Sequence, residues 1–337
     1  MRAAVLQRSG LITLDEVPTP IPGPGEVLIR VRAAAICGSD LARFQGKSHG
    51  QDGAPVIMGH EFAGEIAECG PGVTHVRGDQ RVAAAPLLNC GVCTWCRQGY
   101  EYLCTQRKVF GAQAPGALAE YTLLPARRAY PIPDDLPFEE AALLEPLAIA
   151  AHAVRQAAWK PDDSVLILGA GAIGLLIGQL CAGAQPLVVT DVRADRLALA
   201  RRLEFTAVDV SNDPGVAESK AATGGMGFGI IFDATGSPAA ARLYADLLAV
   251  RGTICAVGTP AGDVPVDIYG LLRKEGRLVT SRFFSAMDYE SALAARLGGP
   301  VALAPLITHR FPLSSFADGG ARVMQAAQQG LRVVVMP

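Results

Sequence analysis

Four of the chain's eight cysteines lie in one short segment, NCGVCTWCRQGYEYLC, at residues 89–104. Cys90, Cys93, Cys96 and Cys104 follow the spacing C-x2-C-x2-C-x7-C, in which short gaps let successive thiolates face one point from tight turns. Four sulfur ligands suit a tetrahedral zinc ion in a closed, structural site. An iron–sulfur cluster also takes four cysteines, but its usual spacings differ from this one. The segment therefore predicts a structural zinc site.

A second set of possible metal ligands lies on either side of this segment. Cys37 occurs in AAAICGSD, and His60 and Glu61 occur together in PVIMGHEFAGEI. Glu145 interrupts the apolar, helix-like stretch ALLEPLAIAAHAV, where a buried carboxylate needs a partner. A thiolate, an imidazole and carboxylates are the ligands of an open, catalytic zinc site. Each residue alone is more often an ordinary core or capping residue, so the prediction depends on their combination with the other motifs.

A glycine-rich motif follows in SVLILGAGAIGLLIGQL. The apolar strand at residues 165–168 leads into Gly169-x-Gly171-x-x-Gly174 and then into a helical pattern, which is the context that a dinucleotide fingerprint requires. Gly169 permits a tight turn, Gly171 lets backbone amides approach a pyrophosphate, and Gly174 allows close packing of helix on strand. The phosphates would lie at a helix N-terminus, which carries partial positive charge.

The nucleotide itself is predicted from Asp191. This residue ends the next strand, PLVVTD, about twenty residues after the glycines, where a carboxylate hydrogen-bonds the adenosine ribose hydroxyls. Arg193 and Arg196 are placed to meet a 2′-phosphate, but the charge of Asp191 would repel that group. The sequence therefore favours NAD over NADP.

The segments that must position these residues alternate between strand-like and helical patterns. EVLIRVRAAAI, before Cys37, alternates as a strand does, and GIIFDATGSP and GTICAVGTP are strand-like segments separated by the helical AAARLYADLLAV. This alternation is typical of an α/β fold with a parallel, doubly wound sheet. TGSP and VGT should border the nicotinamide end of the cofactor. The predicted cofactor-binding residues are Gly169, Gly171, Ala172, Ile173, Gly174, Asp191, Arg196, Thr235, Val257 and Gly258.

Composition excludes several other classes of protein. A chain of 337 residues suits two domains, and 50% hydrophobic with 18% charged residues excludes a disordered chain. The net charge is −2 and the basic residues are scattered, so nucleic acid is not an expected partner. No apolar run reaches the roughly 20 residues of a membrane span. Arg2 and Arg8 interrupt any export signal, so we expect a cytoplasmic protein, in which disulfides between the clustered cysteines are improbable.

The ordered motifs CGSD, GHEFAGEI, the four-cysteine segment, EPLA, GAGAIG and ITHRFPLSSF resemble the zinc-dependent medium-chain alcohol and polyol dehydrogenases nearly end to end. The combination of CGSD, GHE and EP is most similar to the sorbitol, threonine and galactitol-phosphate dehydrogenase branch. The resemblance implies a GroES-like, β-rich catalytic domain at residues 1–146, completed by residues 284–337. It also implies a Rossmann NAD-binding domain at residues 147–283.

The resemblance also implies roles at the second metal site. Its catalytic zinc would use Cys37, His60 and a glutamate, which is either Glu61 or Glu145. The hydroxyl of Ser39 would hand the substrate proton toward solvent. Two departures from the family pattern stand out. The histidine that often follows that hydroxyl by three residues is replaced by Ala42, so His49 or Asp40 are alternative proton routes, and LEFTAVDV lacks the family's glycine before its strand.

The expected reaction is hydride transfer from a secondary alcohol to NAD, and the branch favours a polyol or sugar alcohol as substrate. An amino alcohol such as L-threonine is the alternative. Two rival interpretations are a nucleotide-binding sensor without turnover and a zinc-free quinone or enoyl reductase of the same superfamily. The resemblance further suggests a homodimer or homotetramer formed through the nucleotide domain.

Overall fold

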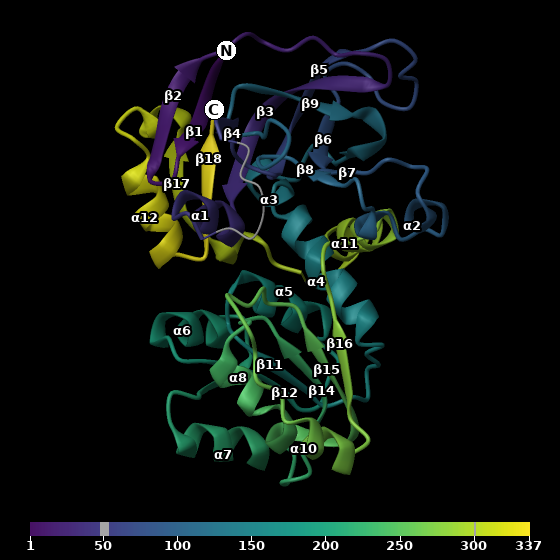
Figure 1. Ribbon diagram of the computed structural model, residues 1–337, viewed down its shortest axis with the longest axis vertical. Coiled ribbons are helices and arrows are strands. Elements are labelled where there is room, and N and C mark those ends of the chain that lie inside the picture. Colours follow the sequence, from purple (N-terminus) through teal and green to yellow (C-terminus); the bar gives the residue numbers. More distant parts are fainter. Residues whose placement is uncertain (48–53, 300) are drawn as a thin grey trace. The chain divides into compact units, whose positions relative to one another are not determined.

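The computed structural model describes residues 1–47, 54–299 and 301–337. The chain divides into two compact units, Met1–Glu145 with Leu303–Pro337 and Pro146–Ala302 (Figure 1). Within the described residues, no helix has both the length and the apolar character needed to cross a bilayer.

The first unit is organised around β3 (Glu26–Ile36), a long strand with hydrogen-bonded neighbours on both edges. One edge pairs along most of its length with β5 (Glu61–Cys69), antiparallel to it. The other edge pairs first with β9 (Tyr121–Pro125) and then with β18 (Arg332–Met336). Because the C-terminal strand β18 lies inside this sheet, the end of the chain belongs to the first unit (Figure 1).

Shorter elements complete this unit. Its other strands are β1 (Arg2–Arg8), β2 (Leu11–Glu16), β4 (Val56–Ile57), β6 (Arg81–Ala84), β7 (Leu87–Leu88), β8 (Lys108–Val109), β10 (Ala129–Pro131) and β17 (Ile307–Pro312). Its helices and 3-10 turns are α1 (Gly38–Phe44), α2 (Thr94–Arg97), η1 (Glu101–Leu103), η2 (Ala126–Arg128), α3 (Phe138–Ala141), η3 (Ala304–Leu306), η4 (Leu313–Phe316) and α12 (Ala321–Gln329).

The second unit contains a six-stranded parallel sheet in the order β13-β12-β11-β14-β15-β16. The strands are β11 (Val165–Leu168), β12 (Leu187–Asp191), β13 (Thr206–Asp209), β14 (Phe228–Asp233), β15 (Leu248–Ala256) and β16 (Arg277–Thr280). The helices are α4 (Leu144–Gln156), which starts at the unit boundary, α5 (Ala172–Leu180), α6 (Ala194–Arg202), α7 (Asp213–Ala221), α8 (Pro238–Arg242), α9 (Tyr244–Leu247), α10 (Ile268–Arg273) and α11 (Ala286–Gly298).

The order of this sheet determines where a ligand binds. The chain runs from β11 outward through β12 and β13, and then returns to the other side of β11 with β14. The carboxyl ends of β11 and β14 therefore flank a topological switch point, which is where open parallel sheets bind ligands. All four residues of β11 are buried, as expected of a strand covered on both faces. The predicted doubly wound sheet is confirmed.

Helix α11 belongs to the second unit, whereas the sequence placed the return to the first domain at residue 284. The buried carboxylate of Asp288 in α11 fastens this helix to α4. His152 Nδ1 lies 2.8 Å from Asp288 Oδ2, and Arg155 Nε donates to Asp288 Oδ1 at 2.7 Å. These contacts link α11 to α4 within the second unit, and the first unit resumes at Leu303.

Asp288 should make the stability of the second unit sensitive to acid. Burial alone would raise its pKa, but hydrogen bonds from His152, Arg155 and Ser285 together lower that pKa below its ordinary range. Its stabilising contribution is therefore present above the ordinary carboxyl pKa of about 4 and is lost as the pH falls below it. Urea unfolding of Asp288→Asn should show lower stability at pH 7 and a shallower loss of stability below about pH 4.

The exposed Asp246→Asn variant is the matched control and should keep the wild-type pH profile. A wild-type acid profile in Asp288→Asn would show that this carboxylate is not the sensitive group.

The family glycine that LEFTAVDV lacks is replaced by Glu204, which adopts a φ of 64°. Glu204 lies two residues after the end of α6, a position where glycine is favoured because a side chain strains the left-handed backbone. Glu204→Gly should therefore stabilise the second unit by about 1 kcal/mol, which thermal denaturation would detect as a rise of about 2–4 °C.

The exposed, helical Glu218 offers a matched comparison, since glycine inside α7 should destabilise by about 1 kcal/mol. Equal effects of the two substitutions would contradict the argument from backbone conformation.

Candidate active site

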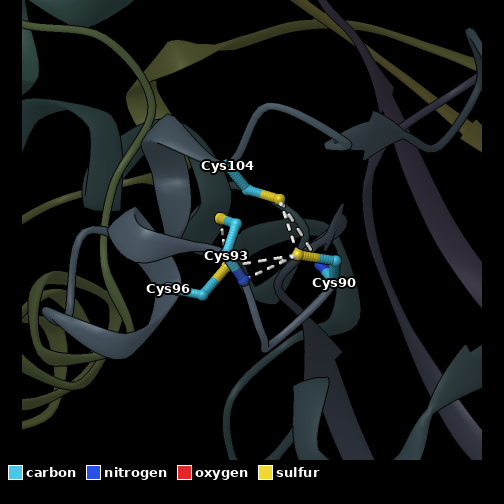
Figure 2. A group of neighbouring side chains, drawn as sticks. All are labelled: Cys90, Cys93, Cys96 and Cys104. Carbon is cyan, nitrogen blue, oxygen red and sulfur yellow. Dashed lines mark hydrogen bonds between the residues drawn. The ribbon is translucent and has the colours of Figure 1, made fainter.

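The four clustered cysteines converge on one point (Figure 2). Cys93 caps the N-terminus of α2, Cys96 lies inside that helix, and Cys104 follows η1. The Sγ atoms of Cys93 and Cys96 are 3.5 Å apart, and those of Cys90 and Cys104 are 3.6 Å apart. Zinc–sulfur bonds of about 2.3 Å in a tetrahedron place sulfur atoms about 3.8 Å from one another. The cluster therefore fits a zinc ion.

Backbone amides donate hydrogen bonds to two of these sulfur atoms. The amide of Cys93 donates to Cys90 Sγ at 3.3 Å, and the amide of Cys90 donates to Cys104 Sγ at 3.4 Å. Backbone hydrogen bonding at Cys96 lowers the pKa of the Cys93 thiol to about 6, whereas burial raises the pKa of the Cys96 thiol to about 11. All eight cysteines are free thiols. The disulfide alternative is therefore not found, and the donor set is that of a structural zinc site.

The second site forms where β3 ends beside the start of β5. Cys37 follows the last residue of β3 and caps α1, while Glu61 begins β5 and pairs with Ala35 in the antiparallel register. The candidate ligand atoms of Cys37, His60 and Glu61 all lie within 4.8 Å of one another. Residues from separate segments thus meet because the strand register brings their segments together.

Two charged residues that the ligand prediction omitted support this group. Asp40 Oδ2 accepts the amide of Cys37 at 3.0 Å, and its Oδ1 lies 3.6 Å from His60 Nδ1. Arg332 Nη2, from β18, lies 3.3 Å from Glu61 Oε1. All of these side chains are buried. The available signal for Arg332 was a lone charge in the apolar segment LRVVVMP.

Three of the four carboxylate oxygens of Asp40 and Glu61 accept no hydrogen bond. Neither carboxylate oxygen of Glu61 accepts one, and neither does Asp40 Oδ1. Burying a carboxylate without such partners is costly unless a cation compensates its charge. Cys37, His60 and Glu61 thus present the sulfur, nitrogen and oxygen donors of an open zinc site.

Glu145 is also close enough to interact electrostatically with this group. It lies in the first turn of α4 and is 6% exposed. Burial raises the pKa of Glu145 to about 8, while the charge of His60 lowers it and that of Glu61 raises it. The three-residue ligand group contains Glu61, and the assignment of Glu145 to the same centre stays a prediction.

The possible proton routes differ in exposure. Ser39 lies in the first turn of α1 and is exposed, as a hydroxyl in contact with solvent must be. Asp40 is 0% exposed and is held by the Cys37 amide, so its carboxylate does not reach solvent. His49 lies outside the described residues.

The glycine motif forms the turn between β11 and α5. Gly169 has a φ of 101°, and a methyl group at Gly174 would overlap the carbonyl oxygen of Gly169. Gly171 caps α5, so the amides of Ala172 and Ile173 belong to the first turn of the helix. Such amides have no partner within their own helix and form a natural phosphate site.

A cavity of about 250 Å³ lies beside this turn, and its wall includes residues of β12, of the segment 210–213 and of α8. Its lining includes Gly169, Asp191 and Asn212. Asp191 Oδ2 accepts the amide of Ala170 at 2.8 Å, which holds the carboxylate beside the glycine turn. The cavity therefore lies where the sequence placed the adenosine half of a dinucleotide.

The two arginines near Asp191 differ in their contacts. Arg193 is paired with its neighbour Asp195, with Nη2 2.8 Å from Oδ2. Arg196 reaches back to the glycine turn, where its Nη1 lies 3.0 Å from the position of a Cβ built on Gly171. Arg196 is therefore the cation adjacent to the N-terminus of α5, where a pyrophosphate would lie.

The residues predicted for the nicotinamide end of the cofactor, Thr235, Val257 and Gly258, lie around Asp233. This buried carboxylate was not selected from the sequence. The side chain of Thr235 lies over Gly169, with Cγ2 2.8 Å from the position of a Cβ there. The amides of Val257 and Gly258 both donate to the carbonyl oxygen of Asp233 at 2.9 Å. The signal for Asp233 was a single charge at the end of an apolar strand, GIIFD.

Comparison with known proteins places these sites in a family. Residues 23–134 match the alcohol dehydrogenase GroES-like domain, and residues 172–297 match the zinc-binding dehydrogenase model. The L-threonine 3-dehydrogenase of Proteus mirabilis (strain HI4320) is 33% identical over 95% of this chain and 94% of its own length.

Two solved structures cover all of this chain and 99% of their own, with TM-scores of 0.90 and 0.91 and 29% identity in both cases. The first is a protein from Sinorhizobium meliloti 1021 bound to NADP, and the second is an alcohol dehydrogenase from Escherichia coli CFT073 complexed with NADH. The expected fold, a GroES-like unit with a Rossmann unit, is confirmed. The chain belongs to the zinc-dependent medium-chain alcohol dehydrogenase family and is an oxidoreductase that acts on a small alcohol.

Proposed function

We propose that the chain oxidises the secondary hydroxyl of a small amino alcohol, with L-threonine as the first candidate and NAD as the hydride acceptor. The convergence of Cys37, His60 and Glu61 supports alcohol oxidation. The similarity to an L-threonine 3-dehydrogenase over 95% of the chain favours an amino alcohol over the polyol that the sequence motifs favoured.

Residues of the first unit have two kinds of role, binding the catalytic zinc and supporting its ligands. Cys37, His60 and Glu61, with Glu145 as a further candidate, would hold the catalytic zinc. When bound, zinc supplies Lewis acidity toward the alcohol oxygen, and NAD supplies an acceptor for hydride. Asp40 orients the segment of Cys37 and faces His60, while Arg332 offsets the charge of Glu61.

Proton and hydride leave the alcohol separately. The exposed hydroxyl of Ser39 accepts the proton of the substrate hydroxyl and passes one to solvent. A bound nicotinamide ring would supply the acceptor for the hydride of the carbinol carbon, so that the alcohol loses one proton and one hydride. The products are a ketone, NADH and one proton.

The preference for NAD over NADP is supported by the position of Asp191. Its carboxylate lines the 250 Å³ cavity and is fixed there by the amides of Ala170, Val192 and Arg193. A 2′-phosphate in this cavity would meet a like charge, and removing that phosphate relieves the repulsion.

The assembly and the compartment are the remaining parts of the proposal. We expect a homodimer or homotetramer formed through the second unit, which light scattering on the purified protein would measure. Eight free thiols suit a reducing compartment, and the cytoplasm is the proposed location.

The decisive experiment measures NADH formation from L-threonine, D-threonine, sorbitol and 2,3-butanediol, with zinc content determined on the same sample. We expect kcat/KM for L-threonine to exceed that for the polyols at least about tenfold, and NADP to be a poorer acceptor than NAD. A polyol preferred over L-threonine would contradict the substrate assignment. No turnover in protein that holds both zinc ions would favour the sensor interpretation, whereas protein without zinc would favour the zinc-free reductase.

A further inference from the structure

Asp233, the last residue of β14, gathers donors from two directions. It is 2% exposed. Its Oδ1 accepts the amide of Thr235 at 2.7 Å, the hydroxyl of Thr235 at 2.6 Å and the amide of Gly236 at 3.2 Å. Its Oδ2 accepts the hydroxyl of Tyr244 at 2.6 Å. A charged acceptor makes these hydrogen bonds stronger than neutral ones.

The main chain of Asp233 fastens a second segment. Its carbonyl oxygen accepts the amides of Val257 and Gly258, which follow β15. These two segments, residues 234–236 and 257–258, are packed so closely that a methyl group at Gly258 would overlap the backbone of Gly236. One buried residue therefore holds together the loops that follow two adjacent strands.

None of residues 234–236 and 257–258 lines the adenosine cavity, although α8, which follows the first loop, contributes Ala239 and Ala240 to its wall. The rest of that wall includes Asp191 of β12 and the segment 210–213. Thr235 contacts the glycine turn itself, since its Cγ2 lies next to Gly169. A dinucleotide with its adenosine in the cavity and its pyrophosphate over the turn must extend its second half toward these loops.

We propose that Asp233 is a positioning residue for the nicotinamide half of the cofactor, and that the hydroxyl of Tyr244 anchors its carboxylate. The proposal rests on the proposed function only in taking a dinucleotide as the cofactor. Asp233 does not contact the cofactor in this arrangement. It acts by fixing Thr235, Gly236 and Gly258 in the geometry that receives the ring.

If Asp233 had a purely structural role, its loss would have a different effect on cofactor binding. If the carboxylate merely stabilised the unit, its loss would affect both halves of the cofactor site alike, or neither. A positioning role affects only the half that lies against the two loops. AMP, which contains only the adenosine half, therefore separates the two roles from NADH.

The test is calorimetric titration of Asp233→Asn with NADH and with AMP. Asparagine has nearly the same shape but lacks the negative charge, so the three donors to Oδ1 are held less firmly. We expect the Kd of NADH to rise about tenfold and that of AMP to change less than about twofold. The exposed Asp246→Asn, on the helix that carries Tyr244, is the control and should alter neither Kd.

Tyr244→Phe provides a second variant if Asp233→Asn does not fold. It keeps the aromatic packing but leaves Oδ2 without its donor, and the Kd of NADH should rise about threefold with AMP binding unchanged. Equal weakening of NADH and AMP, or no change in NADH binding by a folded variant, would overturn the proposal. If the wild-type protein itself binds no NADH, the proposed function fails as well, so the two failures are distinguishable.

Discussion

Replacing Cys37 with serine should lower kcat/KM for the alcohol about 1,000-fold or more and remove one zinc ion from each chain. A serine hydroxyl stays protonated near neutral pH and binds zinc far more weakly than a thiolate does. The donors of the group that remain are His60 and Glu61, with Glu145 as the further candidate, and none of them replaces the thiolate. Steady-state production of NADH and metal analysis of the same preparation measure both effects.

The affinity for NADH should change less than about twofold in this variant, because Cys37 lies in the first unit and the glycine turn lies in the second. Cys69→Ser is the matched control, since Cys69 is a free thiol outside both metal-binding groups. Full turnover by correctly folded Cys37→Ser would show that this thiolate has no role in the reaction.

The second large effect is expected at Gly174, where alanine should weaken NADH binding at least about 100-fold and destabilise the second unit by about 3 kcal/mol. Its new methyl group would overlap the carbonyl oxygen of Gly169 and press on Ile167. Backbone cannot move aside as a flexible side chain can, so the turn that presents the α5 amides must shift. NADH titration and urea unfolding measure the two consequences.

Gly183→Ala is the matched control in the same unit. The nearest atom to a Cβ at Gly183 belongs to Pro161 and is 3.6 Å away, which is ordinary van der Waals contact. This substitution should leave NADH affinity and stability nearly unchanged. Native NADH affinity in Gly174→Ala would contradict the close approach of α5 to β11.

Local spacing in the sequence was enough to predict the four-cysteine zinc site and the glycine turn. In both cases the interacting groups lie within about twenty residues, so the geometry follows from short turns and one strand-to-helix connection. The sulfur atoms converge as the C-x2-C-x2-C spacing requires, and Gly169 takes the positive φ that its place in the motif requires. The alternation of strands and helices likewise predicted the parallel sheet.

Residues whose partners lie far along the chain were harder to predict. Arg332 was missed because the whole second unit separates it from Glu61 in the sequence, and the two residues meet only once β18 pairs with β3. Nothing near residue 284 in the sequence indicates that Asp288 contacts His152 and Arg155 on α4, a contact that joins α11 to the second compact unit. Asp40 was considered as a proton route, and its complete burial could not be predicted from the sequence.

By itself, the sequence determined the types of chemistry available: four thiolates for a closed metal site, a mixed donor set for an open one, and a glycine turn for a dinucleotide. Tertiary structure alone decided which carboxylates accompany these groups and what neutralises them. Glu61 joins Cys37 and His60 because the β3–β5 register places them together, and Asp233 links two loops because their strands are adjacent in the sheet. Ligand types are a property of side chains, whereas their convergence depends on strand pairing between segments distant in sequence.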